Sequence, residues 1–227
     1  MKTDSVLLYY ITDRAAFPGD ERTRRTRLLN KIAEAANQGI DYVQLREKDL
    51  PTRDLESLAR EAMSIVLKLR TENPELRTSL LINSRSDVAI ATAADGVHLP
   101  ANDVWPEEVR TAWNRSSDAG EISPRNLVIG VSCHTPQEVA EAAANHATFA
   151  VFAPVFGKKD GQPAGLEALR QTCRAGIPVL ALGGITLQNA QSCLQAGAAG
   201  IAAIRLFQEN DVATIVRQLR PSSLRSQ

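Results

Sequence analysis

The chain has 227 residues, a length that fits one large domain or two small ones. Hydrophobic residues make up 44% and charged residues 23%, as in a globular protein with enough apolar side chains for a core. The 26 Lys and Arg balance the 26 Asp and Glu, so the sequence lacks the basic excess expected of a protein that binds nucleic acid or membrane surfaces.

Short runs rich in β-branched residues alternate with amphipathic stretches along the chain. In order, the predicted strands are 6–12, 42–46, 79–83, 96–99, 127–132, 149–156, 178–182 and 200–205. The predicted helices lie near 23–38, 53–70, 86–92, 106–113, 136–146, 164–174, 187–196 and 210–219. Strands that are apolar on both faces and alternate with helices indicate parallel pairing under a cover of helices. About eight such units in this length predict a closed (βα)8 TIM barrel.

The boundaries of the predicted elements indicate a single domain, 1–227, because no linker or repeat divides the sequence. One helix start is marked by Thr135 at the N-cap, Pro136 at the first helical position and Glu138 three residues after the threonine. The polar segment 114–125 is predicted as a surface loop, and the tail 221–227 as frayed.

The cysteines and the apolar runs bear on the compartment. No run approaches the ~20 apolar residues that a bilayer requires, and the N-terminus lacks a charged-then-apolar signal region. Cys133, Cys173 and Cys193 lie far apart and are predicted to be reduced thiols that serve packing. We therefore expect a cytoplasmic protein without nucleic-acid or membrane partners, and a homo-oligomer is compatible with this expectation.

Polar residues follow almost every predicted strand. In a TIM barrel, the carboxyl ends of the strands form the face that carries the chemistry. The segments that the sequence places there are 12–14, 44–48, 83–85, 98–103, 132–134, 154–160, 183–185 and 205.

A glycine pair and the last strand end predict a phosphate site. Gly183 and Gly184 follow the seventh predicted strand, and Ile204 and Arg205 end the eighth. Barrels usually bind phosphate between these two loops, where backbone N–H groups can approach the oxygens. Arg205 is a candidate for a charge-assisted bond to that phosphate. The alternative is that the glycines only allow a tight turn and that Arg205 forms a structural salt bridge.

A second group of cations and donors would suit a diphosphate. Arg46, Lys48 and Asn83 follow adjacent strands, and Lys158 and Lys159 lie in a glycine-flanked segment across the rim. A diphosphate needs several such groups around it. A solvated loop explains the two lysines equally well.

Asp103 is the candidate ligand for Mg²⁺, which usually takes one or two carboxylates plus substrate oxygens. Asp13 is a further candidate, and an N-cap for the following helix is the alternative role of Asp103.

His134 follows a strand end in a polar cluster and could move protons near neutral pH. His98 lies in a buried strand and is predicted to be structural, and His146 is expected at a helix end.

Eight motifs at these strand ends, in fixed order, resemble one known family. They read YYITD, QLREK, INSR-D-A, ADGVHL, GVSCHT, APVF, LALGGIT-NA and AGAAGIAAIRLF, between about Leu7 and Arg217. The pattern resembles thiamine phosphate synthase and its relative, the TenI-type thiazole tautomerase. The resemblance implies a (βα)8 barrel enzyme of thiamine biosynthesis. The synthase joins hydroxymethylpyrimidine diphosphate to thiazole phosphate with Mg²⁺ and releases diphosphate.

The resemblance also implies roles for the matching residues on the pyrimidine side. Gln44 would contact the pyrimidine ring, while Arg46, Lys48 and Asn83 would hold the diphosphate. Ser132 would assist in binding the diphosphate.

On the other side, the resemblance places the thiazole phosphate against Gly184 and the backbone of Ile204 and Arg205. Asp103 would bind Mg²⁺. The metal and the cations would stabilise the departing diphosphate as charge develops on it.

Four departures from the synthase pattern weaken the case for Mg²⁺ and for diphosphate chemistry. Ser84 replaces a metal-binding aspartate, and 157–160 replaces a Thr-x-Thr-Lys loop. Pro100-Ala101 replaces a Gly-Gln pair, and Ala153 stands where the family has glycine. Asp13 and Asp160 are candidates to compensate for the missing carboxylate.

These departures leave alternatives to the synthase. The tautomerase aromatises a thiazole phosphate tautomer by proton transfer, and its catalytic histidine would match His134. A non-catalytic binder of thiazole phosphate or thiamine phosphate is the third alternative. Because Gln44, Lys48 and Asp103 are retained, the sequence favours a thiamine-phosphate diphosphorylase-type transferase.

Overall fold

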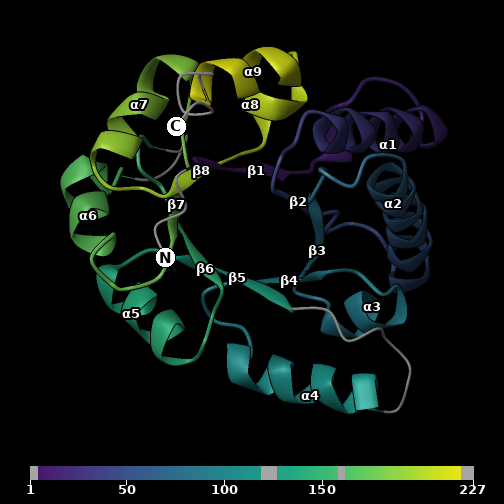
Figure 1. Ribbon diagram of the computed structural model, residues 1–227, viewed down its shortest axis with the longest axis horizontal. Coiled ribbons are helices and arrows are strands. Elements are labelled where there is room, and N and C mark those ends of the chain that lie inside the picture. Colours follow the sequence, from purple (N-terminus) through teal and green to yellow (C-terminus); the bar gives the residue numbers. More distant parts are fainter. Residues whose placement is uncertain (1–4, 119–126, 158–161, 221–227) are drawn as a thin grey trace.

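The computed structural model describes residues 5–118, 127–157 and 162–220, and its strands form a closed parallel barrel (Figure 1). Each strand pairs with its neighbours in chain order, and β8 closes the barrel against β1. The strands are β1 (Leu7–Ile11), β2 (Tyr42–Leu45), β3 (Ser79–Asn83), β4 (Gly96–Leu99), β5 (Val128–Cys133), β6 (Phe149–Phe152), β7 (Val179–Ala181) and β8 (Gly200–Ala203). The predicted TIM barrel is confirmed.

Helices surround the barrel as an outer ring (Figure 1). They are η1 (Arg14–Ala16), α1 (Glu21–Asn37), α2 (Thr52–Glu72), α3 (Ser86–Ala91), α4 (Pro106–Asp118), α5 (Pro136–Ala144), α6 (Gly165–Thr172), α7 (Leu187–Gln195), α8 (Arg205–Gln208) and α9 (Val212–Leu219). The predicted start of α5 is confirmed, because the Glu138 N–H donates to Thr135 Oγ1 over 3.2 Å. Among the helices of the described ranges, none has both the length and the apolarity needed to cross a membrane.

Three predicted boundaries are wrong. α4 continues through 114–118, which were predicted as loop, because Val109 and Trp113 bury one face of this helix and packing extends it. Residues 119–125 of that loop and the tail 221–227 lie outside the described ranges. The strand predicted to reach residue 156 ends at Phe152, and Pro154 has no N–H with which to continue the ladder. The strand predicted to reach 205 ends at Ala203, and Arg205 instead begins the short helix α8.

Side chains fill the inside of the barrel beneath its mouth. Tyr42 and Phe149 stack with ring centroids 4.7 Å apart, and Tyr9 meets Phe149 edge-on at 5.4 Å. These aromatic side chains belong to an inner cluster distinct from the larger core between the strands and the helices. The lower barrel is therefore packed, and the cavity inside the barrel lies toward the carboxyl ends of the strands.

Two carboxylates brace the opposite, amino-terminal rim. Asp95, just before β4, accepts the Leu80 N–H over 2.8 Å and binds Arg70 with an Nη2–Oδ2 distance of 2.6 Å. Asp41, just before β2, accepts the Leu8 N–H over 2.7 Å and pairs with Arg220. Each carboxylate thus joins a neighbouring strand to a cation from the end of a helix.

The three cysteines are free and serve packing. Burial raises the pKa of the Cys133 thiol to about 12 and that of Cys173 and Cys193 to about 11. All three thiols are therefore protonated and weakly nucleophilic near neutral pH.

Candidate active site

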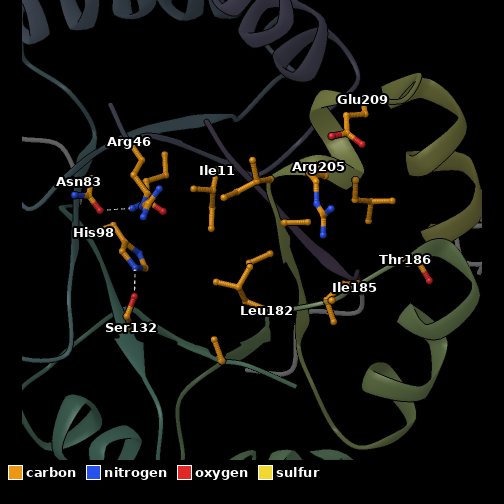
Figure 2. Close-up of a pocket in the computed structure, with 18 of the residues that line it drawn as sticks. Ile11, Arg46, Asn83, His98, Ser132, Leu182, Ile185, Thr186, Arg205 and Glu209 are labelled. Carbon is orange, nitrogen blue, oxygen red and sulfur yellow. Dashed lines mark hydrogen bonds between the residues drawn. The ribbon is translucent and has the colours of Figure 1, made fainter. Parts of the chain in front are cut away.

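A cavity of about 760 Å³ opens at the carboxyl ends of the strands (Figure 2). Its size is typical of a small-molecule site. It is lined by ten of the predicted site residues: Gln44, Arg46, Lys48, Asn83, Ser132, His134, Gly183, Gly184, Ile204 and Arg205. Lys158 and Lys159 lie outside the described ranges, and Asp103 is not among the lining residues.

The segment after β2 alternates between two faces. Gln44, Arg46 and Lys48 line the cavity, whereas Leu45 and Glu47 are buried away from it. This alternation follows from extended backbone, in which successive side chains point to opposite faces. It explains why a strand end carries cations and an acid together, because only the cations face the cavity.

Glu47 holds this segment in place. Its Oε1 accepts the Thr12 hydroxyl over 2.5 Å, and its Oε2 accepts the Arg14 N–H over 3.0 Å. Burial raises the pKa of the Glu47 carboxyl, and these two hydrogen bonds partly oppose that shift. The Arg46 N–H donates to Thr12 Oγ1 over 3.0 Å. The ends of β1 and β2 are thereby joined, and the sequence pattern did not reveal this role of Glu47.

Arg14 completes the same network from η1. Its guanidinium donates to both oxygens of Asp49, over 2.7 and 2.9 Å, and to Glu21 over 2.7 Å. Hydrogen bonds from Arg14 hold the pKa of Asp49 below its ordinary value. The fork geometry makes these strong charge-assisted bonds, so the cavity-facing side chains after β2 start from a rigid backbone.

Two amides meet at the ends of β2 and β3. Gln44 Nε2 donates to Asn83 Oδ1 over 2.7 Å, and Asn83 Nδ2 donates to Ser84 Oγ over 3.2 Å. Gln44 is 1% exposed, and its Oε1 has no hydrogen-bond partner in the described part of the chain. A buried acceptor without a partner is costly, so this oxygen is available for a donor on a bound ligand.

His98 lies inside the barrel and not among the helices. Its Nε2 is 2.8 Å from Ser132 Oγ, and the dashed line in Figure 2 marks this bond. Burial and the charge of Arg46 lower the pKa of His98 to about 3, so the ring is neutral. The prediction that His98 is structural was therefore incomplete, because His98 also lines the cavity. The sequence held the signal: Val97 and Leu99 pack toward the helices, which turns His98 inward.

His134 carries a defined tautomer. Its Nδ1 lies 2.7 Å from the carbonyl oxygen of Ala153, and its backbone N–H donates to Glu138 Oε2 over 2.6 Å. A carbonyl oxygen only accepts, so Nδ1 carries the proton and donates it. Nε2 is the ring nitrogen left for contact with a bound molecule.

The glycine pair after β7 shapes the other side of the cavity. Gly183 has φ 101° and Gly184 has φ 67°, values that favour glycine. A Cβ on Gly184 would lie 2.7 Å from the Phe156 carbonyl oxygen. The N–H groups of both glycines donate to no acceptor within the described ranges. They are available to an anion.

Neighbouring residues support this loop and extend it. Asn189 Nδ2 donates to the Gly184 carbonyl over 2.9 Å, and its Oδ1 accepts the Thr186 N–H over 2.8 Å. α8 begins at Arg205, and first-turn N–H groups have no partner within a helix. Thr186, Gln188 and Glu209 also line the cavity and were missed by the sequence prediction.

The two polar regions face each other across an apolar strip. In Figure 2, Arg46, Asn83 and His98 lie on one side and Arg205 on the other, with the side chains of Ile11 and Leu182 between them. The arrangement can hold two anionic groups with an apolar surface between them.

The surroundings of Asp103 bear on the predicted Mg²⁺ site. Asp103 Oδ1 accepts the adjacent Val104 N–H over 2.9 Å, a local bond, and no group of three or more His, Cys, Asp or Glu suited to a metal occurs in 5–118, 127–157 and 162–220. Ser84, with φ 59°, offers a hydroxyl that already accepts from Asn83. The assignment of Mg²⁺ to Asp103 stays a prediction.

Comparisons with known proteins agree on one family. A family model described as thiamine monophosphate synthase matches residues 8–207. A putative thiamine-phosphate synthase of Geobacter sulfurreducens is 40% identical over 87% of this chain and 84% of its own length. A thiamine-phosphate synthase of Methanoculleus marisnigri is 36% identical over 94% of this chain and 93% of its own.

Solved structures give the same result. Thiamine phosphate pyrophosphorylase from Pyrococcus furiosus is 30% identical, with a TM-score of 0.73 over 94% of this chain and 93% of that one. A 3-hexulose-6-phosphate synthase is 15% identical with a TM-score of 0.57, a likeness of fold alone.

Proposed function

This chain belongs to the thiamine monophosphate synthase family, and from this premise we propose that it joins hydroxymethylpyrimidine diphosphate to thiazole phosphate and releases diphosphate. The observation that carries the proposal is that groups able to bind anions lie on opposite sides of one cavity, Arg46 and Lys48 on one side and the Gly183–Gly184 loop with Arg205 on the other. A reaction between a diphosphate and a monophosphate ester needs two such regions. A single-phosphate substrate would leave one of them unused.

The cations after β2 would act on the leaving group. When the methylene carbon–oxygen bond breaks, its electron pair leaves with the diphosphate. Arg46 and Lys48 would stabilise that growing negative charge from the cavity wall. Gln44 Oε1, the buried acceptor without a partner, would accept from the exocyclic amine of the pyrimidine.

The other side of the cavity would deliver the nucleophile. The N–H groups of Gly183 and Gly184, with the start of α8, would hold the thiazole phosphate. Ile11 and Leu182 would shield the pyrimidine cation from water until the thiazole nitrogen donates its lone pair and the new carbon–nitrogen bond forms.

We expect the purified protein to release diphosphate only when both phosphorylated substrates are present. Diphosphate release is measured with and without Mg²⁺, with each substrate omitted in turn, and beside a known synthase. Full dependence on Mg²⁺ would support the predicted role of Asp103. Absence of turnover while the known synthase works would remove the proposal.

One observation favours a second candidate, the thiazole tautomerase. His134 lines the cavity with its ring oriented by the Nδ1 bond to Ala153. If this activity is present, the protein will aromatise the thiazole phosphate tautomer without metal, and His134→Ala will lower that rate by about 10²-fold or more. An unchanged rate in His134→Ala rejects the candidate. Binding of thiazole phosphate without turnover in either assay would instead indicate a non-catalytic binder.

A further inference from the structure

The hydrogen bond between His98 and Ser132 joins β4 and β5 at the wall of the cavity. We propose that His98 is a positioning residue that donates its Nε2 proton to Ser132 Oγ, so that the serine O–H turns toward an oxygen of the bound diphosphate. The contacts around the His98 ring show which of the two side chains donates the hydrogen. That the serine hydroxyl donates to a diphosphate oxygen rests on the proposed function.

The environment of Nδ1 decides which ring nitrogen carries the proton. Nδ1 is buried and has no hydrogen-bond partner among the described residues. It faces Gly130 on the paired strand, where an atom in the Cβ direction would lie 2.8 Å from Nδ1. The Cα hydrogen of Gly130 points along that direction. A polarised C–H group interacts favourably with a nitrogen lone pair but would clash with an N–H group. Nδ1 is therefore the unprotonated ring nitrogen.

The charge state of the ring follows from what surrounds it. His98 is 3% exposed, and the groups around it are Ser132, the rings of Tyr9 and Phe149, and the cationic Arg46. No carboxylate faces the ring in the interactions of the described residues. Burial and Arg46 together hold the pKa at about 3. The neutral ring has a single proton, and a bare Nδ1 leaves that proton on Nε2.

The proton on Nε2 sets the role of Ser132. A hydroxyl that accepts from Nε2–H keeps its own hydrogen for a second partner. Phosphate oxygens only accept, so this hydrogen suits the anion that Arg46 and Lys48 would hold. In the opposite tautomer, the serine O–H would donate to Nε2. Only the lone pairs of the serine oxygen would then face the anion, and they would repel it.

Nitrogen-15 NMR of the histidine side chains in the full-length protein tests the hydrogen bond directly. At neutral pH we expect His98 to show the neutral Nε2–H tautomer, assigned by comparison with His98→Gln. A neutral Nδ1–H tautomer or a cationic ring overturns the proposal, whether or not the protein is an active synthase.

Matched variants test the consequence, with inorganic diphosphate as the probe in calorimetry. The amide nitrogen of His98→Gln reaches the place of Nε2, whereas that of His98→Asn reaches only the place of Nδ1. We expect His98→Gln to retain diphosphate affinity within about 3-fold, and His98→Asn and Ser132→Ala to lose about 10-fold or more. Equal losses in the Gln and Asn variants would show that His98 only fills space and overturn the positioning role. No binding by the unsubstituted protein would instead count against the diphosphate as recipient and against the proposed function.

Discussion

Replacing Arg46 with alanine is expected to lower kcat/KM for the pyrimidine diphosphate by about 10²–10³-fold. The Arg46 guanidinium lines the cavity and forms no hydrogen bond or ion pair with any described residue. Its removal therefore breaks no side-chain hydrogen bond or ion pair with a described residue, and the variant should fold normally. The loss would report the missing charge beside the leaving group, measured as steady-state release of diphosphate.

Two control variants separate this effect from charge in general. Arg46→Lys keeps the charge but loses the planar guanidinium, so its rate should fall between those of the unsubstituted protein and Arg46→Ala. Arg60→Ala removes an exposed arginine on α2 that pairs with Glu56, and its turnover should stay unchanged. An Arg46→Ala enzyme as fast as the unsubstituted protein would exclude Arg46 from the reaction.

Replacing Gly184 with alanine is expected to raise KM for the thiazole phosphate by about 10²-fold. The new Cβ would lie 2.7 Å from the Phe156 carbonyl oxygen, so the loop must shift and its N–H groups move away from the phosphate. Loss of hydrogen bonds to a charged group costs about 1.5–3 kcal/mol each. Initial rates at varied thiazole phosphate and saturating pyrimidine diphosphate measure the effect.

Gly176→Ala is the matched control for this variant. Gly176 has φ 84°, similar to Gly184, but a Cβ there would meet no atom within 4 Å. Both variants should lose about 1–2 kcal/mol of folding stability through backbone strain, while only Gly184→Ala should change KM. A similar KM in the two variants would contradict the assignment of this loop to phosphate.

The barrel and most of its mouth could be predicted from the sequence because both follow from local rules. Parallel strands bring their carboxyl ends together, and extended backbone sends Gln44, Arg46 and Lys48 to the same face. The partners of Glu47 could not be predicted in this way. Thr12 and Arg14 lie more than 30 residues earlier in the chain, and only the closed barrel brings them to the carboxylate.

Other parts were missed for different physical reasons. α8 has four residues, too few for a helical hydrophobic period to be visible. Thr186 and Gln188 reach the cavity because the glycine turn after β7 aims the start of α7 at it. The role of Asp103, the compartment, the absence of nucleic-acid partners and the oligomeric state stay predictions.

The carboxylate braces before β2 and β4 separate two kinds of evolutionary change. Asp41 and Asp95 tie strands to Arg220 and Arg70 at the end of the barrel remote from the cavity, and none of these four residues lines it. Substitutions that alter the stability of the barrel at that end therefore leave the residues that line the cavity unchanged. At the reacting end, side chains that line the cavity without bracing strands, such as Arg46, can change without loss of these two braces.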